Sequence, residues 1–507
     1  MLRTIGQPGR NPTSVPRVYT SLREPRFPVP VNIHRAFSRD PADGLSCFRT
    51  IAEKSVMEAR HASFEVAETG PLATDLLLDP AFPYGEDLLQ FIWEAGLYDG
   101  TDLRTTNDEQ LEVLHAGRIQ PNGGPDLSGA QVRIGAQLWA GNVEVHLRTS
   151  DWNAHGHQHD PAYNNVVLHT VYQHDAEVRT ENGTCPPTVE LRGRIHQRNL
   201  QLHQALMTAH RTVPCATHLG RVEPVRIRLW LERLLVERLE RKALEVETLY
   251  RSLGNDPQET LHHLLLRGLG KPVNSEPFGM LAHALPLKLL LKYREDGLRV
   301  EALLLGQAGF LDEVFSEEHP LRLQQEYRWL AGLHGLRPVP VAAWKLGRLR
   351  PPNFPTVRLA QWAAVLSASG HGGYDQLLVH DDHRPIGALL EVEPSGYWRD
   401  HYRPGHASLT KAKPMGQDMA RNLVINAIVP YLFAMGRIRG HQPWEDRALA
   451  LLEQLPAERN AIIREWGALG VAATSAGQGQ ALIELRNRYC MERKCLSCAI
   501  GIHLHKG

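Results

Sequence analysis

The sequence is poor in cysteine, balanced in charge and free of long apolar runs. Its 507 residues contain 6 cysteines, which are too few for a fold organised by disulfides. Lysine plus arginine and aspartate plus glutamate number 56 each, so a nucleic-acid partner must meet a local basic patch rather than a global field. No apolar run approaches the roughly 20 residues that cross a bilayer, and no secretion signal begins the chain. We expect a cytoplasmic protein with no membrane partner.

The length and patterning predict several parts. Residues 1–84 are rich in proline and arginine with little periodicity, which is typical of a poorly ordered extension. Residues 85–200 predict a helix, three strands, a short helical turn and another strand. Amphipathic segments dominate residues 201–480, and a cysteine-rich segment follows at 481–507. We therefore expect an α+β fold in which an α/β domain, with a mixed sheet flanked by helices, precedes a mostly α-helical domain.

Three polar residues stand in predicted strands of the stretch NGGPDLSGAQVRIGAQLWAGNVEVHLR. Asp126 begins one strand, and alternation puts Glu144 and His146 on the same face of the next. A hairpin turning near Gly135 can bring Asp126 close to Glu144. Two carboxylates repel each other unless a cation lies between them, and oxygen-rich sites suit Mg²⁺ or Mn²⁺. The alternative is that Asp126 is only a turn acid and the other two residues lie on a solvated strand face.

The pattern resembles that of the PD-(D/E)xK nucleases at Pro125-Asp126 and Glu144-Val145-His146. The resemblance implies a restriction-endonuclease-like fold in which Asp126 and Glu144 hold the metal and the Val145 carbonyl assists. It also makes Glu94, on the preceding helix, an auxiliary acid. His146 departs from the family pattern, which has lysine there. A histidine can orient or deprotonate water near neutral pH, or bind the metal directly.

A histidine run follows these strands in SDWNAHGHQHDPAYNNVVLH. His155, His157 and His159 alternate, and imidazoles at such positions are good zinc ligands. The run resembles the His-x-His-x-Asp-His motif of metallo-β-lactamase-like hydrolases, with the last two residues in swapped order at His159-Asp160. This leaves open a zinc hydrolase built on residues 155–159, or a polar loop beside the acidic site. His169 alternates with apolar residues and could be a core histidine.

Three of the cysteines lie close together in YCMERKCLSCAIGIHLHKG. Cys490, Cys495 and Cys498 have spacings that can wrap one metal ion, and His503 would complete a Cys₃His site for Zn²⁺. An iron–sulfur cluster is the other possibility, and it would need a distant fourth ligand such as Cys215. Some PD-(D/E)xK nucleases carry such clusters. We predict a metal here, with zinc preferred.

Two loops of the helical half mix basic and aromatic residues, around AAWKLGRLRPPNFPTVRLAQW and SGYWRDHYRPGHASLTKAKPMGQ. Arginine grips phosphates and aromatic rings stack on bases, so either loop could guide DNA or RNA. The alternative is that these side chains pack at a domain junction. The predicted nucleic-acid contacts are Arg348, Arg350, Arg358, Arg399, Arg403, Lys411 and Lys413.

Several separated stretches also resemble a bacterial family catalogued as a domain of unknown function (DUF2851-like), among them GGPDLSGAQVRI, GRLRPPNFPTVRLAQ and YCMERKCLSCAIG. The resemblance runs from about residue 85 to the end and implies no substrate. Taken with the strand-borne acids, the sequence predicts a metal-dependent phosphodiester hydrolase of DNA or RNA. The rival from another class is a non-catalytic nucleic-acid-binding or scaffold protein with a degenerate nuclease core.

Overall fold

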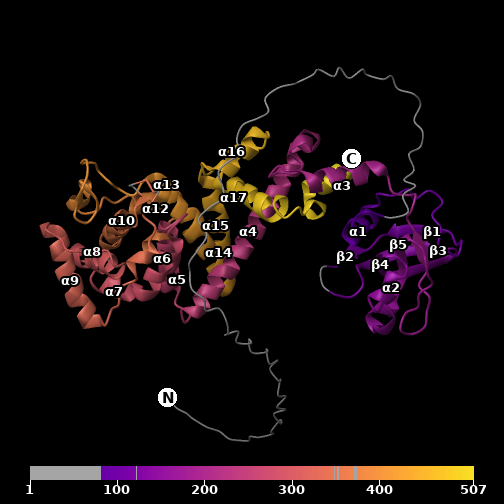
Figure 1. Cartoon of the computed structure of the whole chain (residues 1–507), viewed down its shortest axis with the longest axis horizontal. Coiled ribbons are helices and arrows are strands. Elements are labelled where there is room, and N and C mark those ends of the chain that lie inside the picture. The colour runs from indigo at the N-terminus through magenta and orange to yellow at the C-terminus, as the bar shows by residue number, and fades with distance from the viewer. Residues whose placement is uncertain (1–81, 121–122, 348, 351–352, 370–373) are drawn as a thin grey trace, which may run out of the picture. The chain divides into compact units, whose positions relative to one another are not determined.

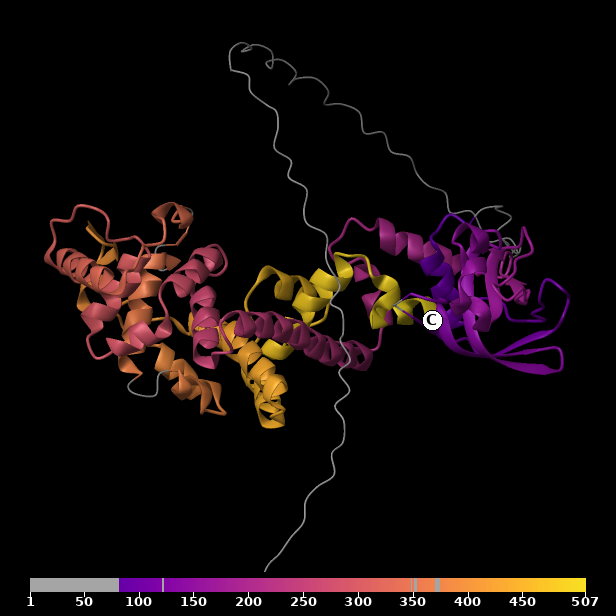
Figure 2. The same cartoon turned by 90° about the horizontal axis from the view of Figure 1, so that it is seen from below.

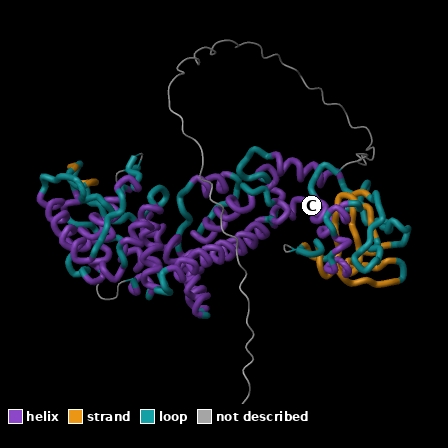
Figure 3. Tube along the Cα trace, turned by 60° about the horizontal axis from the view of Figure 1, so that its bottom comes forward, coloured by secondary structure: helices purple, strands orange, loops and turns teal. Residues whose placement is uncertain are grey.

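The computed structural model describes residues 82–120, 123–347, 349–350, 353–369 and 374–507 (Figure 1). The extension predicted at 1–84 therefore lies outside the described residues, except for its last three. Strands gather in the amino-terminal part of the described chain, and helices make up most of the rest (Figure 3). The predicted α+β class is confirmed.

Helix α1 (Glu86–Ala95) opens the α/β part. Its apolar residues recur at helical spacing, so five of them are buried on one side. Gly96 ends the helix in a left-handed conformation with φ 65°, and its backbone N–H bonds to the carbonyls of Ile92 and Trp93. The helix that the sequence predicts at the start of residues 85–200 is therefore present.

A six-stranded mixed sheet follows. Its order is β1-β3-β4-β5-β6, and β2 pairs with the first two residues of β3. The pairs β1–β3 and β3–β4 are antiparallel, while β4–β5 and β5–β6 are parallel. The strands are β1 (Leu111–His115), β2 (Arg118–Ile119), β3 (Leu127–Ile134), β4 (Gln137–Arg148), β5 (Val166–Gln173) and β6 (Thr188–Glu190). The predicted mixed sheet is confirmed.

The turn between β3 and β4 has two residues, and Gly135 takes φ 56° there. This fixes the register so that Ile134 pairs with Gln137. Val143 and Val145 then point into an apolar core shared with α1, and Glu144 and His146 occupy the other face of β4. That core begins at Phe82, three residues before the predicted domain start.

The connection from β4 to β5 contains α2 (Asp151–Ala154) and two 3₁₀ turns, η1 (His157–His159) and η2 (Pro161–Asn165). Gly156 adopts φ 82° between α2 and η1, which L side chains rarely adopt. The Asp160 carboxylate then accepts from the Ala162 N–H and caps η2. These two local features fold the histidine run back over the sheet.

Helices dominate the remainder of the described chain, apart from the hairpin of β7 (His401–Arg403) and β8 (His406–Ala407). The helices are α3 (Gln197–Thr208), α4 (Pro224–Ser252), α5 (Pro257–Leu269), α6 (Ser275–Ala284), α7 (Leu287–Lys292), α8 (Gly297–Gln307), α9 (Glu318–His334), α10 (Pro355–Ala368), α11 (Asp375–Leu378), α12 (His383–Leu390), α13 (Gln417–Leu423), α14 (Val429–Arg439), α15 (Gln442–Gln454), α16 (Ala461–Ala468), α17 (Ala476–Leu485) and α18 (Ala499–Lys506). Short turns also occur at η3 (Ala216–Arg221), η9 (Arg486–Cys490) and η10 (Cys495–Ser497).

One described helical stretch, Gln417–Arg439, is long and apolar enough to cross a membrane by length and composition. It comprises α13, a π-helical segment at Val424–Ile428 and α14. However, 78% of its most apolar 18-residue window is buried inside the protein. Its apolar surface is therefore covered by other helices, as in the core of a folded domain.

The long helix α4 runs beside α17 (Figures 1 and 2). A buried ion pair joins them: the Glu484 carboxylate accepts from Arg238 Nη1 at 3.0 Å and from Arg241 Nη2 at 2.7 Å. The last helix, α18, contacts both apolar cores, because Leu504 is buried in the helical core and Ile502 packs against the α/β core.

Candidate metal centre

The candidate site lies on the polar face of β4. Alternation predicts that Glu144 and His146 share this face, and the Glu144 Oε1 atom lies 3.5 Å from His146 Nε2. Both side chains are almost fully buried, at 3% and 1% exposure. A buried carboxylate is costly unless it is hydrogen-bonded, paired with a cation or bound to a metal. The surroundings of Glu144 therefore decide what the site can hold.

Asp126 is the first neighbour of Glu144. Its backbone N–H donates to Glu144 Oε2 at 3.0 Å, and its own Oδ2 accepts from the Val145 N–H at 3.0 Å. The two predicted acids therefore meet across β3 and β4. Burial, and to a smaller extent the nearby Glu144, raise the pKa of the Asp126 carboxyl to about 7, against the opposing effect of hydrogen bonds from Val145 and Gln90. Such a pair of acids favours a cation between or beside them.

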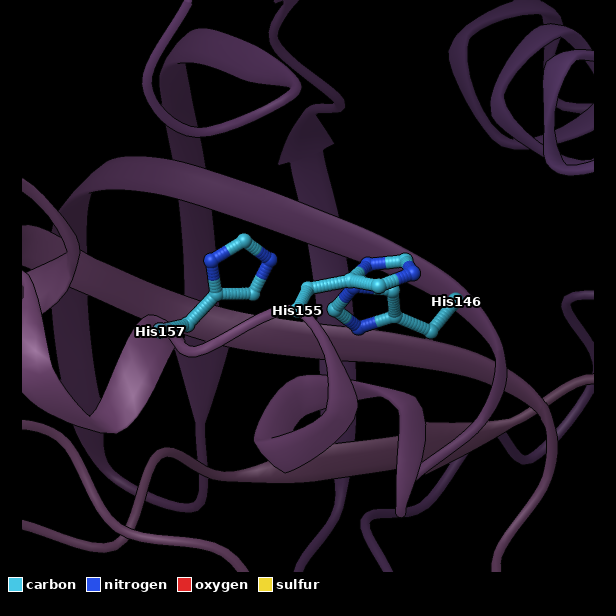
Figure 4. A group of neighbouring side chains, drawn as sticks. All are labelled: His146, His155 and His157. Atoms are coloured by element: carbon cyan, nitrogen blue, oxygen red, sulfur yellow. The ribbon is translucent and has the colours of Figure 1, made fainter.

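The histidine run completes the site. From the sequence, this run was predicted as a zinc site of its own or as a loop beside the acids. His157 Nε2 lies 3.2 Å from Glu144 Oε1, and His146 Nε2 lies 3.1 Å from His155 Nδ1. Ligand atoms of these three histidines all lie within 4.8 Å of one another. Figure 4 shows the three rings gathered together beside β4. His159 is exposed and stays outside this group.

The distances fit a metal ion. The separations of 3.1, 3.2 and 3.5 Å among these nitrogen and oxygen atoms match the ligand–ligand spacing of about 3.4 Å around tetrahedral zinc with Zn–N bonds of about 2.1 Å. His157 Nε2 is buried and has no well-formed hydrogen bond, although the Glu144 carboxylate lies beside it. An uncompensated ring nitrogen next to a buried carboxylate is what two ligands of one cation would show.

The remaining contacts orient the ligands. His146 Nδ1 lies 2.9 Å from Nε2 of the fully buried His169 on β5. The His157 ring stacks on Tyr163 with centroids 3.8 Å apart. Burial, followed by the neighbouring imidazoles, lowers the pKa of His146 to about 2 and that of His169 to about 3. Both are therefore neutral at pH 7, which is the form that binds metals.

Helix α1 contributes different residues from the one we predicted. Gln90 hydrogen-bonds to Asp126, and Glu86 interacts electrostatically with Glu144 and His155. Glu94 instead is exposed, and its Oε1 accepts from the Ile119 N–H of β2. Eight residues after Glu86, it lies about 12 Å further along the helix axis. Glu94, predicted as the auxiliary acid, therefore lies outside the cluster, and Glu86 is the α1 carboxylate that interacts with it.

The structure separates the predicted nucleic-acid contacts into two groups. Arg358 is buried and donates to Gln361 and Asn353, and Lys413 is buried with Nζ donating to the Trp398 and Arg399 carbonyls. These two side chains hold loops together and cannot reach a phosphate, which corrects that part of the prediction. Arg399 and Arg403 are at least partly accessible; Arg399 binds Glu393, and Arg403 lies 3.7 Å from Glu313. Arg348 lies outside the described residues, and Arg350 and Lys411 are exposed.

The carboxyl-terminal cysteines lie in the helical core, away from the β4 site in sequence. Cys490, Cys495 and Cys498 are buried, and Cys215 is buried next to them. The predicted fourth ligand, His503, is half-buried on α18. The pKa values of Cys215, Cys495 and Cys498 are shifted by burial and by other neighbours, and His503 is not among the described groups that shift them.

Together these features define an α+β protein with a buried carboxylate–imidazole cluster on a mixed sheet. Residues 86–461 match the family described as Protein of unknown function (DUF2851), and the chain belongs to that family. The matched region contains the whole β4 site and Cys215 and ends before the three carboxyl-terminal cysteines. No curated protein and no solved structure matches the chain.

Proposed function

We propose that this protein is a divalent-metal-dependent hydrolase that cleaves the phosphodiester bonds of DNA or RNA. The observation that carries the proposal is the position of the Glu144 carboxylate, 3.2 Å and 3.5 Å from two histidine nitrogens and hydrogen-bonded to the Asp126 backbone. The phosphodiester class rests on the resemblance of Pro125-Asp126 and Glu144-Val145-His146 to the PD-(D/E)xK pattern. The strand order, with three antiparallel strands followed by a parallel one, supports the same class.

The donor set suggests which metal would bind. Glu144, His146, His155 and His157 offer one carboxylate and three imidazoles, a mixture that suits Zn²⁺ or Mn²⁺ better than Mg²⁺. The proposal thus moves from the predicted Mg²⁺ or Mn²⁺ pair toward a site that also uses the histidine run. A divalent cation held there would supply Lewis acidity to a phosphate oxygen.

The chain's own residues have separable roles in this proposal. His146 is a poor base, since its pKa is lowered to about 2 by burial and by its neighbours, so we assign it to metal binding rather than to deprotonating water. Asp126, with a pKa raised to about 7 by burial and by Glu144, is better suited to exchange a proton with water near neutral pH. Gln90 holds the Asp126 carboxyl in place through its side-chain hydrogen bond.

The test is cleavage by the purified full chain of single- and double-stranded DNA and RNA with Mn²⁺, Zn²⁺ or Mg²⁺. We expect cleavage with at least one of the first two ions, and a loss of at least about 100-fold in Glu144→Gln. The matched control is Glu112→Gln, which removes an exposed carboxylate that pairs with Arg133 on the same sheet. It should cut as the wild type does. Full activity in Glu144→Gln would overturn the proposal.

The metal content gives a second measure. His157→Ala should lower the bound metal by one equivalent per chain and leave any metal at the cysteines in place. Unchanged metal content in this variant would contradict the proposed ligand set.

A non-catalytic scaffold is the second candidate, and one observation favours it. His146 stands where the PD-(D/E)xK pattern has lysine. Both of its ring nitrogens already contact other histidines, at 2.9 Å from His169 and 3.1 Å from His155. If the chain binds nucleic acid without turnover under every divalent metal tested, the scaffold replaces the hydrolase.

A further inference from the structure

Four cysteines from distant parts of the sequence converge in the helical core. Cys215 precedes η3, Cys490 ends η9, Cys495 begins η10 and Cys498 precedes α18. Each is at most 7% exposed. Cys185, the other cysteine among the described residues, is exposed and lies outside this group. The burial of all four in one place requires a specific reason, because free thiols have no need to cluster.

The segments that carry the four thiols are in contact, because η10 contacts η9 and α18, and η3 contacts α18. All four cysteines belong to the same apolar core. Burial, and to a smaller extent Cys498 and Cys495, together raise the pKa of Cys215 to about 12. Cys490 is affected in the same direction by burial and then by the other three cysteines. A cluster in which each sulfur opposes the ionisation of the next is unfavourable as bare thiolates. A bound cation removes that penalty, because metal coordination deprotonates thiols.

Donors surround the cluster on the protein side. Burial raises the pKa of Cys498, and the backbone N–H groups of Gly501 and Ile500 and the indole of Trp230 oppose the rise. The Trp230 indole nitrogen is buried, with 6% of the residue exposed, and has no well-formed hydrogen bond. Arg493 lowers the pKa of Cys495 against the effect of burial. Hydrogen-bond donors and a cation around sulfur are typical of metal–thiolate centres.

We propose that Cys215, Cys490, Cys495 and Cys498 together hold one metal centre through four thiolates, with Cys215 in place of His503 as the fourth ligand. Among the described residues, no three of these sulfur atoms lie within 4.8 Å of one another. Thiolates bound to one tetrahedral Zn²⁺ lie closer, at roughly 3.8 Å, so the spacing favours an iron–sulfur cluster as the occupant, and a single Zn²⁺ ion is the other outcome of the test. Each thiol gives up its proton when its sulfur bonds to the metal, so binding releases four protons and involves no redox change at sulfur.

The centre would fasten the start of the helical region to its end. Arg493 already joins these segments, since its guanidinium donates to the Arg211 carbonyl at 3.3 Å and to the Cys490 carbonyl at 2.9 Å. Elements η3 and α18 lie in contact at the same place. A metal link between residues so far apart in sequence removes much freedom from the unfolded chain, so it stabilises the fold.

The experiment measures metal per chain and the visible spectrum of the full-length protein purified without oxygen. A colourless protein with zinc bound at the cysteines identifies the ion, and a brown protein with iron and acid-labile sulfide identifies the cluster. In either case, the amount of metal bound at the cysteines should be at least about 10-fold lower in Cys215→Ser than in the wild type. The matched control Cys185→Ser should keep all of it, and His503→Ala should keep it too.

Thiol alkylation of the wild-type protein keeps the test valid if Cys215→Ser does not fold. All four thiols should resist iodoacetamide in the native protein and react after a chelator is added, whereas Cys185 should react in both conditions. Wild-type metal content in Cys215→Ser, loss of metal in His503→Ala, or chelator-independent alkylation of Cys215 would each overturn the proposal. These results do not depend on cleavage activity or on His157.

Discussion

At the scale of single residues, this protein buries several histidines in their neutral form. His262 on α5 is fully buried, with Nδ1 2.8 Å from the Tyr374 hydroxyl and Nε2 3.2 Å from the Leu285 carbonyl. Burial, and to a smaller extent the neighbouring His263, together lower its pKa from 6.5 to about 3. The unfolded chain therefore binds a proton at this position at a higher pH than the folded chain does. Stability should fall as the pH drops below about 6.5, and this loss continues until about pH 3.

Replacing His262 tests that linkage. His262→Gln should flatten the dependence of unfolding free energy on pH between pH 4.5 and 6 by up to about 1.4 kcal/mol per pH unit, the value for one proton. Urea unfolding at a series of pH values measures it. Leu266→Ala on the same helix should lower the whole curve by about 2–5 kcal/mol without changing its slope. Parallel curves for His262→Gln and wild type would contradict the assignment.

Single-residue predictions from sequence succeeded where the cause is local. Strand alternation put Glu144 and His146 on one face, and the short turn at Gly135 brought Asp126 across from them. These predictions failed where the position of a side chain depends on residues that are distant in the sequence. Nothing in the spacing of Arg358 shows that its guanidinium is buried against Asn353 and Gln361, since that depends on loops that pack over α10. Glu86 lies four residues before Gln90 on the same face of α1, but the sequence does not show that this face meets Asp126.

At the scale of elements, α4 and α17 are held together by more than apolar contact. Glu484 is 2% exposed. Burial alone would raise its pKa, but hydrogen bonds and charge from Arg241 and Arg238 lower it overall. A buried ion pair of this kind is stable only while the carboxylate and the guanidiniums are all present, because a charge left without its partner is costly to bury.

Removing one partner should therefore weaken the α4–α17 packing. Glu484→Gln leaves two partly buried arginines without their buried carboxylate and should cost about 3–5 kcal/mol of unfolding free energy in chemical denaturation. The comparison is Glu245→Gln, which removes the exposed partner of Arg241 on α4 and should cost less than about 1 kcal/mol. Equal effects of the two substitutions would show that the buried pair contributes no more than a surface one.

Element prediction shows the same division between local and distant causes. The amphipathic periodicity of residues 225–253 predicts the long helix α4, and the helical spacing of apolar residues in EDLLQFIWEAGL predicts α1. The histidine run was harder to place, because its position over β4 depends on the left-handed turn at Gly156 and on the parallel pairing of β4 with β5. Sequence periodicity shows neither, so the run was expected beside the acids rather than among them.

At the scale of the whole described chain, α18 joins the two apolar cores. Ile500 and Leu504 are buried in the helical core, Ile502 packs against the α/β core, and His505 contacts Phe91 of α1 with ring centroids 5.3 Å apart. A chain ending at Cys498 loses all of these contacts and keeps its four cysteines. We expect it to unfold at a lower temperature and in two calorimetric transitions, where the full chain unfolds in one.

Removal of only Lys506 and Gly507, which are exposed, is the control and should leave a single transition. A chain ending at Cys498 with the wild-type profile would show that α18 does not couple the cores. This role was not predictable from sequence. The segment 481–507 was expected to be a separate metal-binding tail, and only tertiary packing shows that it belongs to both cores.

The row of rings from His169 through His146 to His155 has one more consequence. Each neutral imidazole carries a single ring hydrogen, so the row has two possible tautomeric arrangements, and in each of them all the donors point the same way. A ligand that takes the lone pair of His146 Nε2 forces the hydrogen onto Nδ1, which must then donate to His169. His169 is thereby driven into its Nδ1–H tautomer, although that nitrogen is buried without a partner. If a metal binds His146 in the proposed site, the tautomer of His169 would therefore change with it, although His169 is not one of the proposed ligands.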